Sequence, residues 1–145
     1  MLEDFKPLIK EENPDAASIE VFLKRGDVAK ALSACRRAGR NLEQFSDALE
    51  SGLRKMFLAG RANEILSLIY NKKITCKYTI PALLRAVLDK QDYPGFLKQA
   101  YRFKVYQGFE AEIERSLEWL VQKKQHATAE AYRLKFGQLR EGSKA

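Results

Sequence analysis

A glycine and an aspartate stand together at residues 26 and 27, between two segments of helix-forming residues. Gly26 suits the left-handed backbone that ends a helix, and Asp27 suits the cap that begins the next one. The small side chain of Ala31, in the second segment, allows two paired helices to approach closely. This junction predicts a tight helical hairpin over residues 14–38.

Weaker copies of the junction follow at residues 57–60, 87–92 and 120–125. Their apolar anchors are 35, 30 and 33 residues apart, at Leu23, Leu58, Leu88 and Val121. Such a period is typical of stacked helical hairpins. A repeat architecture makes a docking surface, rather than a catalytic pocket, the leading expectation for function.

Caps, stops and apolar spacing predict an all-α fold of about eight helices. Asn13 and Pro14 begin the first helix, Asn41 caps the third and Asp92 caps the sixth. The expected helices cover residues 14–25, 27–38, 41–57, 62–71, 80–90, a segment from 92, 108–123 and 126–139. They form four helix-turn-helix hairpins, with residues 72–78 as a linker and the fifth helix, apolar nearly all round, as a central element. We expect a single helical-repeat domain over residues 1–145, with flexible ends at 1–12 and 140–145.

The first junction carries a specific set of residues, which are Phe22, Leu23, Gly26, Asp27, Lys30, Ala31, Leu32 and, further on, Ala38. It resembles the tetratricopeptide repeat. The third hairpin keeps Asp92 and Tyr93 of that pattern, the fourth keeps Ala129, and the second keeps its glycine and aliphatic flank. The resemblance implies a right-handed α-solenoid whose groove accepts peptides or a partner's helix. Other irregular α-solenoids and a compact helical bundle remain alternatives.

The charge of the chain is uneven. Residues 1–20 hold two lysines and six acids, a net charge of −4, whereas the rest of the chain carries +11. Such a surplus favours an acidic partner, either a protein surface, a nucleic acid or an anionic membrane, although it also serves solubility alone.

The two cysteines, Cys35 and Cys76, have no spacing typical of a disulfide framework. The N-terminus lacks the basic start and apolar core of a signal peptide, and no apolar run is long enough to span a bilayer. We therefore expect a cytoplasmic protein.

No constellation of residues points to catalysis. His126 is the single histidine, neither cysteine has ligand spacing to another residue, and no glycine-rich phosphate loop occurs. The acids Glu110, Glu114 and Glu118 follow one helix face and are expected to be solvated. The sequence predicts no catalytic residue, no metal site and no cofactor.

Two groups of residues are candidates for binding. The first combines aromatic and cationic side chains that suit a protein partner, and its members are Arg54, Lys55, Lys98, Tyr101, Arg102 and Trp119. The second is a basic stripe that suits phosphates, and its members are Arg36, Arg37, Arg40, Arg61, Lys72, Lys73 and Lys77. Helix C-termini attract cations without any ligand, which is the alternative for several of them.

Taken together, these features predict a non-enzymatic adaptor or chaperone-like module that docks a peptide or helix of a partner protein within a larger complex. The alternative is a basic helical protein that binds RNA or DNA. Pairing of the chain with itself through an uncapped end stays open.

Overall fold

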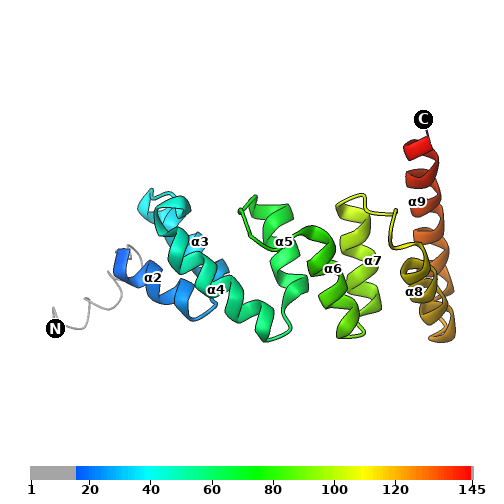
Figure 1. Ribbon diagram of the computed structural model, residues 1–145, viewed down its shortest axis with the longest axis horizontal. Helices are drawn as coiled ribbons and strands as arrows, with labels where there is room; N and C mark the ends of the chain where they lie inside the picture. Colours follow the sequence, from blue (N-terminus) through cyan, green and yellow to red (C-terminus); the bar gives the residue numbers. More distant parts are fainter. Residues whose placement is uncertain (1–15, 145) are drawn as a thin grey trace. The chain divides into compact units, whose positions relative to one another are not determined.

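The computed structural model describes residues 16–144, whose regular elements are all helices, with no strand among them. They form eight α-helices, labelled α2 to α9, and a short 3₁₀ helix, η1 (Figure 1). The predicted all-α fold is confirmed. The chain divides into two compact units, Met1–Ala59 and Gly60–Ala145, each of which is described by itself. The expected cap at Asn13-Pro14 and the expected flexibility of residues 1–12 lie outside the described residues.

The first unit contains α2 (Ala16–Lys24), α3 (Val28–Ala38), η1 (Leu42–Phe45) and α4 (Ser46–Leu58). Helix α2 packs against both α3 and α4. Its side chains Ile19 and Leu23 are fully buried, as is Ala31 of α3. Gly52 lets α4 approach α2, since a side chain at this position would collide with the backbone carbonyl of Leu23.

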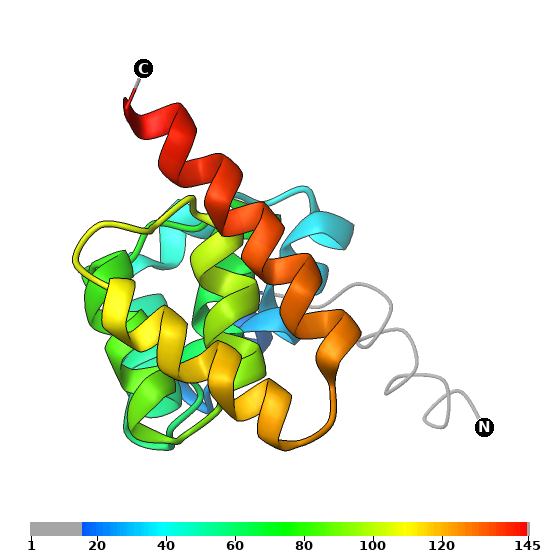
Figure 2. The same ribbon diagram turned by 90° about the vertical axis from the view of Figure 1, so that its right-hand side faces the viewer.

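The second unit contains α5 (Ala62–Lys72), α6 (Ile80–Asp89), α7 (Tyr93–Arg102), α8 (Glu110–Gln122) and α9 (His126–Lys144). Each helix packs against the next, and α7 also contacts α5 and α9. Figure 2 shows α8 and α9 as an antiparallel pair. The core is formed by large apolar side chains, among them Ile65, Leu66, Leu83, Leu84, Phe96, Leu97, Leu117 and Leu120.

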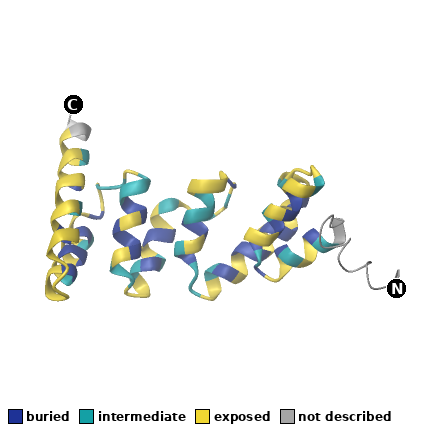
Figure 3. Ribbon diagram, turned by 180° about the vertical axis from the view of Figure 1, so that it is seen from behind, coloured by how far each residue is buried: buried dark blue, intermediate teal, exposed yellow. Residues whose placement is uncertain are grey.

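Three of the four expected hairpins are present as packed pairs, namely α2–α3, α6–α7 and α8–α9. The helices of the remaining one, α4 and α5, belong to different units, so their pairing stays a prediction. So does the single domain, because it depends on how the two units sit together. Helix α9 continues beyond its expected end at residue 139 to Lys144. The outward side of this last helix is exposed along most of its length (Figure 3).

The helix junctions repeat one backbone geometry. A left-handed residue occupies the equivalent position of each, with φ of 84°, 77°, 58° and 61° at Gly26, Gly60, Gln91 and Lys124. In three junctions the N–H of this residue donates to the carbonyl three residues back, and the next N–H donates to the carbonyl five residues back. The donor–acceptor pairs are Gly26–Leu23 and Asp27–Phe22, Gln91–Leu88 and Asp92–Val87, and Lys124–Val121 and Gln125–Leu120. The next helix then starts at once.

This geometry corrects the register of the second junction. The residue three before Gly60 is Phe57, whereas the predicted anchor Leu58 is 72% exposed. With Phe57 in place of Leu58, the anchors are 34, 31 and 33 residues apart. The four junctions with left-handed residues are therefore spaced more evenly than the apolar anchors expected from the sequence.

Three local expectations also differ from the structure. Asp27 occupies the cap position of α3, but its side chain makes no capping hydrogen bond. Asn41 accepts from the N–H of Glu43, so it caps η1 and not the long helix α4 directly. Helix α6 buries one face, with Leu83, Leu84 and Val87, and exposes the other, so it is not enclosed on all sides. Residues 73–79 are non-helical, as expected of the linker.

A buried polar network joins α5 to α7. The side chain of Gln99 is fully buried, and its Nε2 donates to Asn63 Oδ1 at 2.6 Å and to Ser67 Oγ at 2.9 Å. Asn63 in turn donates to Asp92, whose other oxygen accepts from the N–H of Gly95. Because buried polar groups are stable only with partners, these bonds fix how α5 and α7 pack.

Candidate binding surface

The predicted basic and aromatic segment around residue 101 lies at the end of α7. Tyr101 and Arg102 are its last two residues, both are half-buried, and they contact different neighbours. The ring of Tyr101 lies edge-on to Phe136 of α9, with centroids 6.2 Å apart. The guanidinium carbon of Arg102 lies 5.1 Å from the ring centroid of Tyr70, on α5.

Tyr70, near the end of α5, contacts two cations and one aromatic ring. Two cations lie on its ring, Arg102 at 5.1 Å and Lys73 at 5.2 Å from the centroid, while Phe103 meets it edge-on at 5.6 Å. Tyr70 as a whole is 39% exposed. Both cations are therefore held at the surface by one tyrosine, since each is attracted to the electron-rich face of the ring.

Lys135, on α9, also lies near tyrosine rings. Its ammonium lies 5.2 Å from the ring centroid of Tyr101 and 5.4 Å from that of Tyr132. Burial raises the pKa of the Tyr132 hydroxyl, and the nearby charge of Arg102 acts in the opposite direction. Arg102 contacts Tyr70, and its charge also acts on Tyr132. We call this set of residues the cation–aromatic surface, and its members are Tyr70, Lys73, Tyr101, Arg102, Tyr132 and Lys135.

The positive charge of this surface is not neutralised within the described part of the chain. Its three cations, Lys73, Arg102 and Lys135, form no ion pair there, whereas Arg61 pairs with Glu64 and Arg133 with Glu114 elsewhere on the unit. Each cation–ring contact at an exposed site contributes only about 0.5–1 kcal/mol. The rings therefore position the cations without cancelling their charge, and the surface is suited to an anionic ligand.

Comparison of the chain with protein-family models, curated proteins and solved structures found no match. The function is therefore inferred from the geometry of the surface itself.

The other predicted site residues are dispersed over the two units. Arg36, Arg37, Arg40, Arg54 and Lys55 lie in the first unit and are exposed. Arg61, Lys72, Lys73 and Lys77 lie in the second. Alignment of the seven residues of the basic stripe across the two units stays a prediction. Within the second unit, only Lys73 of the stripe joins the cation–aromatic surface; Arg61 is paired with Glu64, and Lys77 lies 5.6 Å from the ring of Tyr78.

Trp119 and Lys98 stand apart from the cation–aromatic surface. Trp119 is half-buried and packs on Tyr93 with centroids 5.5 Å apart, and Lys123 lies 5.7 Å from its ring. It is therefore a contact between α7 and α8, and only part of its side chain is open to a partner. Lys98 is exposed on α7.

Tyr70, Tyr132 and Lys135 were not predicted from the sequence, although the sequence contains a pattern that includes them. The motif Tyr-x-x-Lys begins at Tyr70, Tyr101 and Tyr132, and its copies are 31 residues apart. The motif ends α5 and α7, where Lys73 and Lys104 take left-handed φ of 55° and 54°, and it lies inside α9. Because α7 packs against both α5 and α9, this period brings the three tyrosines to neighbouring helices of one unit.

Among the described residues, no group of three or more His, Cys, Asp or Glu side chains is placed to hold a metal ion. None of the helices over residues 16–144 has the length and apolarity needed to cross a membrane.

Proposed function

We propose that this protein is a non-enzymatic helical-repeat adaptor that docks an acidic segment of a partner protein, as a module of a larger complex. The repeat part of this proposal is supported by the left-handed junction that recurs in four places along the chain. The binding part is carried by one observation, the cation–aromatic surface, whose three cations form no ion pair with any residue that the structure describes.

The contacts within the surface favour carboxylates over stacked bases. Single-stranded nucleic acids are bound chiefly by stacking bases on aromatic faces that are free. The ring of Tyr70 already has two cations within 5.2 Å of its centroid, and Lys135 lies on both Tyr101 and Tyr132. A base would have to displace these cations, whereas a glutamate or aspartate side chain binds them where they are.

Binding of RNA or DNA remains the second candidate because of one specific observation. The Tyr-x-x-Lys motif recurs at a constant 31-residue interval, and a regular array of cations matches the regular charge of a phosphate backbone. Three phosphate contacts on a single strand would give a slope of about −2 in the plot of log affinity against log salt.

A direct binding comparison separates these possibilities. The probes are a fluorescent glutamate-rich peptide and a fluorescent dT oligonucleotide of equal length, titrated with the full chain at several salt concentrations. We expect the peptide to bind more tightly and Arg102→Glu/Lys135→Glu to weaken it by at least about tenfold, since a hydrogen bond to a charged group contributes about 1.5 kcal/mol or more. The matched control is Lys90→Glu/Arg115→Glu, which makes the same charge change at exposed positions of the same unit.

Tighter binding of the oligonucleotide, with the steep salt slope, would replace the adaptor by the nucleic-acid candidate. Equal weakening by the control variant would show that net charge, and not this surface, drives the interaction. Absence of binding to both probes would overturn the site.

A further inference from the structure

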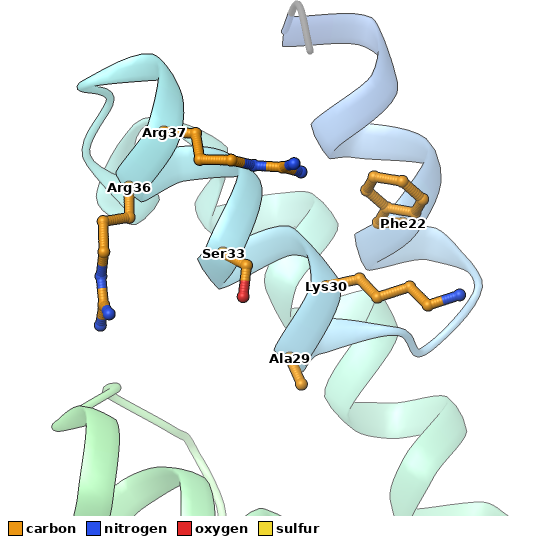
Figure 4. Close-up of a pocket in the computed structure, with 6 residues that line it drawn as sticks. All are labelled: Phe22, Ala29, Lys30, Ser33, Arg36 and Arg37. Carbon is orange, nitrogen blue, oxygen red and sulfur yellow. The ribbon is translucent and has the colours of Figure 1, made fainter. Parts of the chain in front are cut away.

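The first unit has a groove of its own between α2 and α3. It encloses about 540 Å³ and is lined by Phe22 of α2 and by Ala29, Lys30, Ser33, Arg36 and Arg37 of α3. Figure 4 shows the side chains of Arg37 and Lys30 extending toward α2 on either side of the Phe22 ring. We call it the basic groove.

The basic groove combines positive charge with uncovered apolar surface. Its cations Lys30, Arg36 and Arg37 are exposed and have no ion pair in the described part of the chain, and no acid lines the groove. Phe22 is half-buried, and the adjacent Val21 is 44% exposed. A ligand that fits must therefore supply both carboxylates and apolar side chains.

The segment that precedes α2 has this composition. Residues 1–15 contain five acids, at positions 3, 4, 11, 12 and 15, against two lysines, a net charge of −3. They also contain large apolar residues, among them Leu2, Phe5, Leu8 and Ile9. The remainder of the chain is strongly basic, so this segment is its natural electrostatic complement.

The segment is also long enough to reach the groove. Helix α2 has nine residues, a length of about 13 Å, whereas fifteen residues of extended chain span up to about 50 Å. A segment tethered so closely is present at an effective concentration in the millimolar range. Even a weak contact is then largely formed, and a free acidic peptide at micromolar concentration does not compete with it.

We propose that residues 1–15 of this chain dock in the basic groove, with their carboxylates on Lys30 and Arg37 and their apolar side chains on Phe22. The first unit then carries its own acidic ligand, and any partner for this groove must displace it. This inference is independent of the cation–aromatic surface, which lies in the other unit.

Cross-linking of the full chain tests the contact directly. A carbodiimide activates a carboxyl group, which a nearby lysine amine attacks to form an amide as the urea leaves. In an equal mixture of ¹⁴N- and ¹⁵N-labelled chains, we expect amides between Lys30 and acids of residues 3–15, in isotopically pure pairs. The exposed Lys24, which is nearer in sequence, serves as the control for random encounters. Cross-links of equal yield at Lys24 and Lys30, or isotopically mixed pairs that indicate a second copy, would overturn the proposal.

Hydrogen exchange provides a second measurement on the same chain. Suppose that the dissociation constant of the contact between the segment and the groove is half the effective concentration of the segment. The segment is then two-thirds bound, and its amides exchange about threefold more slowly than they would in the unbound segment. We expect Lys30→Glu/Arg37→Glu to abolish this protection in residues 1–12. Restoration by an added Glu11→Lys/Glu12→Lys change is expected, whereas Arg54→Glu/Lys55→Glu on α4 should leave the protection intact. Identical exchange in the wild-type chain and in the groove variant would refute the inference.

Discussion

Gly52 provides the sharpest test of how the first unit is packed. An alanine side chain at this position would collide with the carbonyl oxygen of Leu23 and lie 3.0 Å from its carbonyl carbon. That oxygen also accepts the hydrogen bond from Gly26 N–H, at 3.0 Å, which closes the turn between α2 and α3. Because the obstacle is backbone, the collision can be relieved only if α2 moves away from α4.

The size of the effect follows from two opposed contributions. Overpacking of a closely packed site costs about 1–3 kcal/mol, and the collision with a carbonyl group places Gly52→Ala at the upper end of that range. Replacing glycine by alanine inside a helix returns about 1 kcal/mol. We therefore expect a net loss of about 2 kcal/mol, which lowers the urea midpoint by about 1 M for an m-value near 2 kcal/mol/M.

The assay is urea unfolding followed by far-ultraviolet circular dichroism. The matched control is Gly137→Ala in α9, where an added Cβ meets nothing within 4 Å. This variant should gain up to about 1 kcal/mol because only helix propensity changes. If Gly52→Ala were as stable as the wild type, or gained as much as Gly137→Ala, the close approach of α2 and α4 would be wrong.

Two further predictions concern the junctions and the thiols. Gln91→Gly should raise the free energy of unfolding, measured in urea, by about 1 kcal/mol, because Gln91 has a left-handed φ of 58°, which is unfavourable for a residue with a side chain. Gly26→Ala, at φ 84°, should lower it by a similar amount for the same reason. A loss of stability at both positions would contradict this reasoning. An alkylating reagent at pH 8 should modify Cys76 well before Cys35, as followed by mass spectrometry. Cys35 is only 3% exposed, and burial raises the pKa of its thiol above the ordinary value, with the charge of Arg40 acting in the opposite direction. The stability that depends on the neutral Cys35 thiol is complete below the ordinary pKa of a thiol and is lost as the pH rises through the pKa of Cys35 in the folded chain. Equal alkylation rates of the two cysteines are expected in urea; equal rates in the folded chain would disprove the burial of Cys35.

Helix ends were predictable because their causes are local. Gly26 and Gly39 take the left-handed conformation, and Asp92 caps α7 through the N–H of Gly95, as residues of these types do. The register of the second junction was not predictable from Phe57 and Leu58, since both are apolar and only packing distinguishes them. The left-handed backbone at Gln91 and Lys124 was not predictable either, because glutamine and lysine side chains do not favour this conformation, which the turn imposes on them.

The candidate site was predicted in part. Tyr101 and Arg102 were chosen for their chemistry, and the structure places both in the cation–aromatic surface. Trp119 was expected to matter if exposed, and its contact with Tyr93 shows that it is partly used in packing. The basic groove was not foreseen, because Phe22 was assigned only to the repeat pattern and Arg37 to the basic stripe or to a helix end that favours cations.

The sequence by itself determined that this chain is all-helical, where its helices turn and how its charge is divided between an acidic start and a basic remainder. These properties follow from capping, apolar spacing and composition, each of which acts over a few residues. Only the tertiary structure decided that Arg102 lies on Tyr70, that Lys135 lies between Tyr101 and Tyr132, and that α4 meets α2 at a glycine. The contacts of Arg102 with Tyr70, of Lys135 with Tyr101 and of Gly52 with Leu23 join residues about thirty positions apart, and their geometry depends on how whole helices pack against one another.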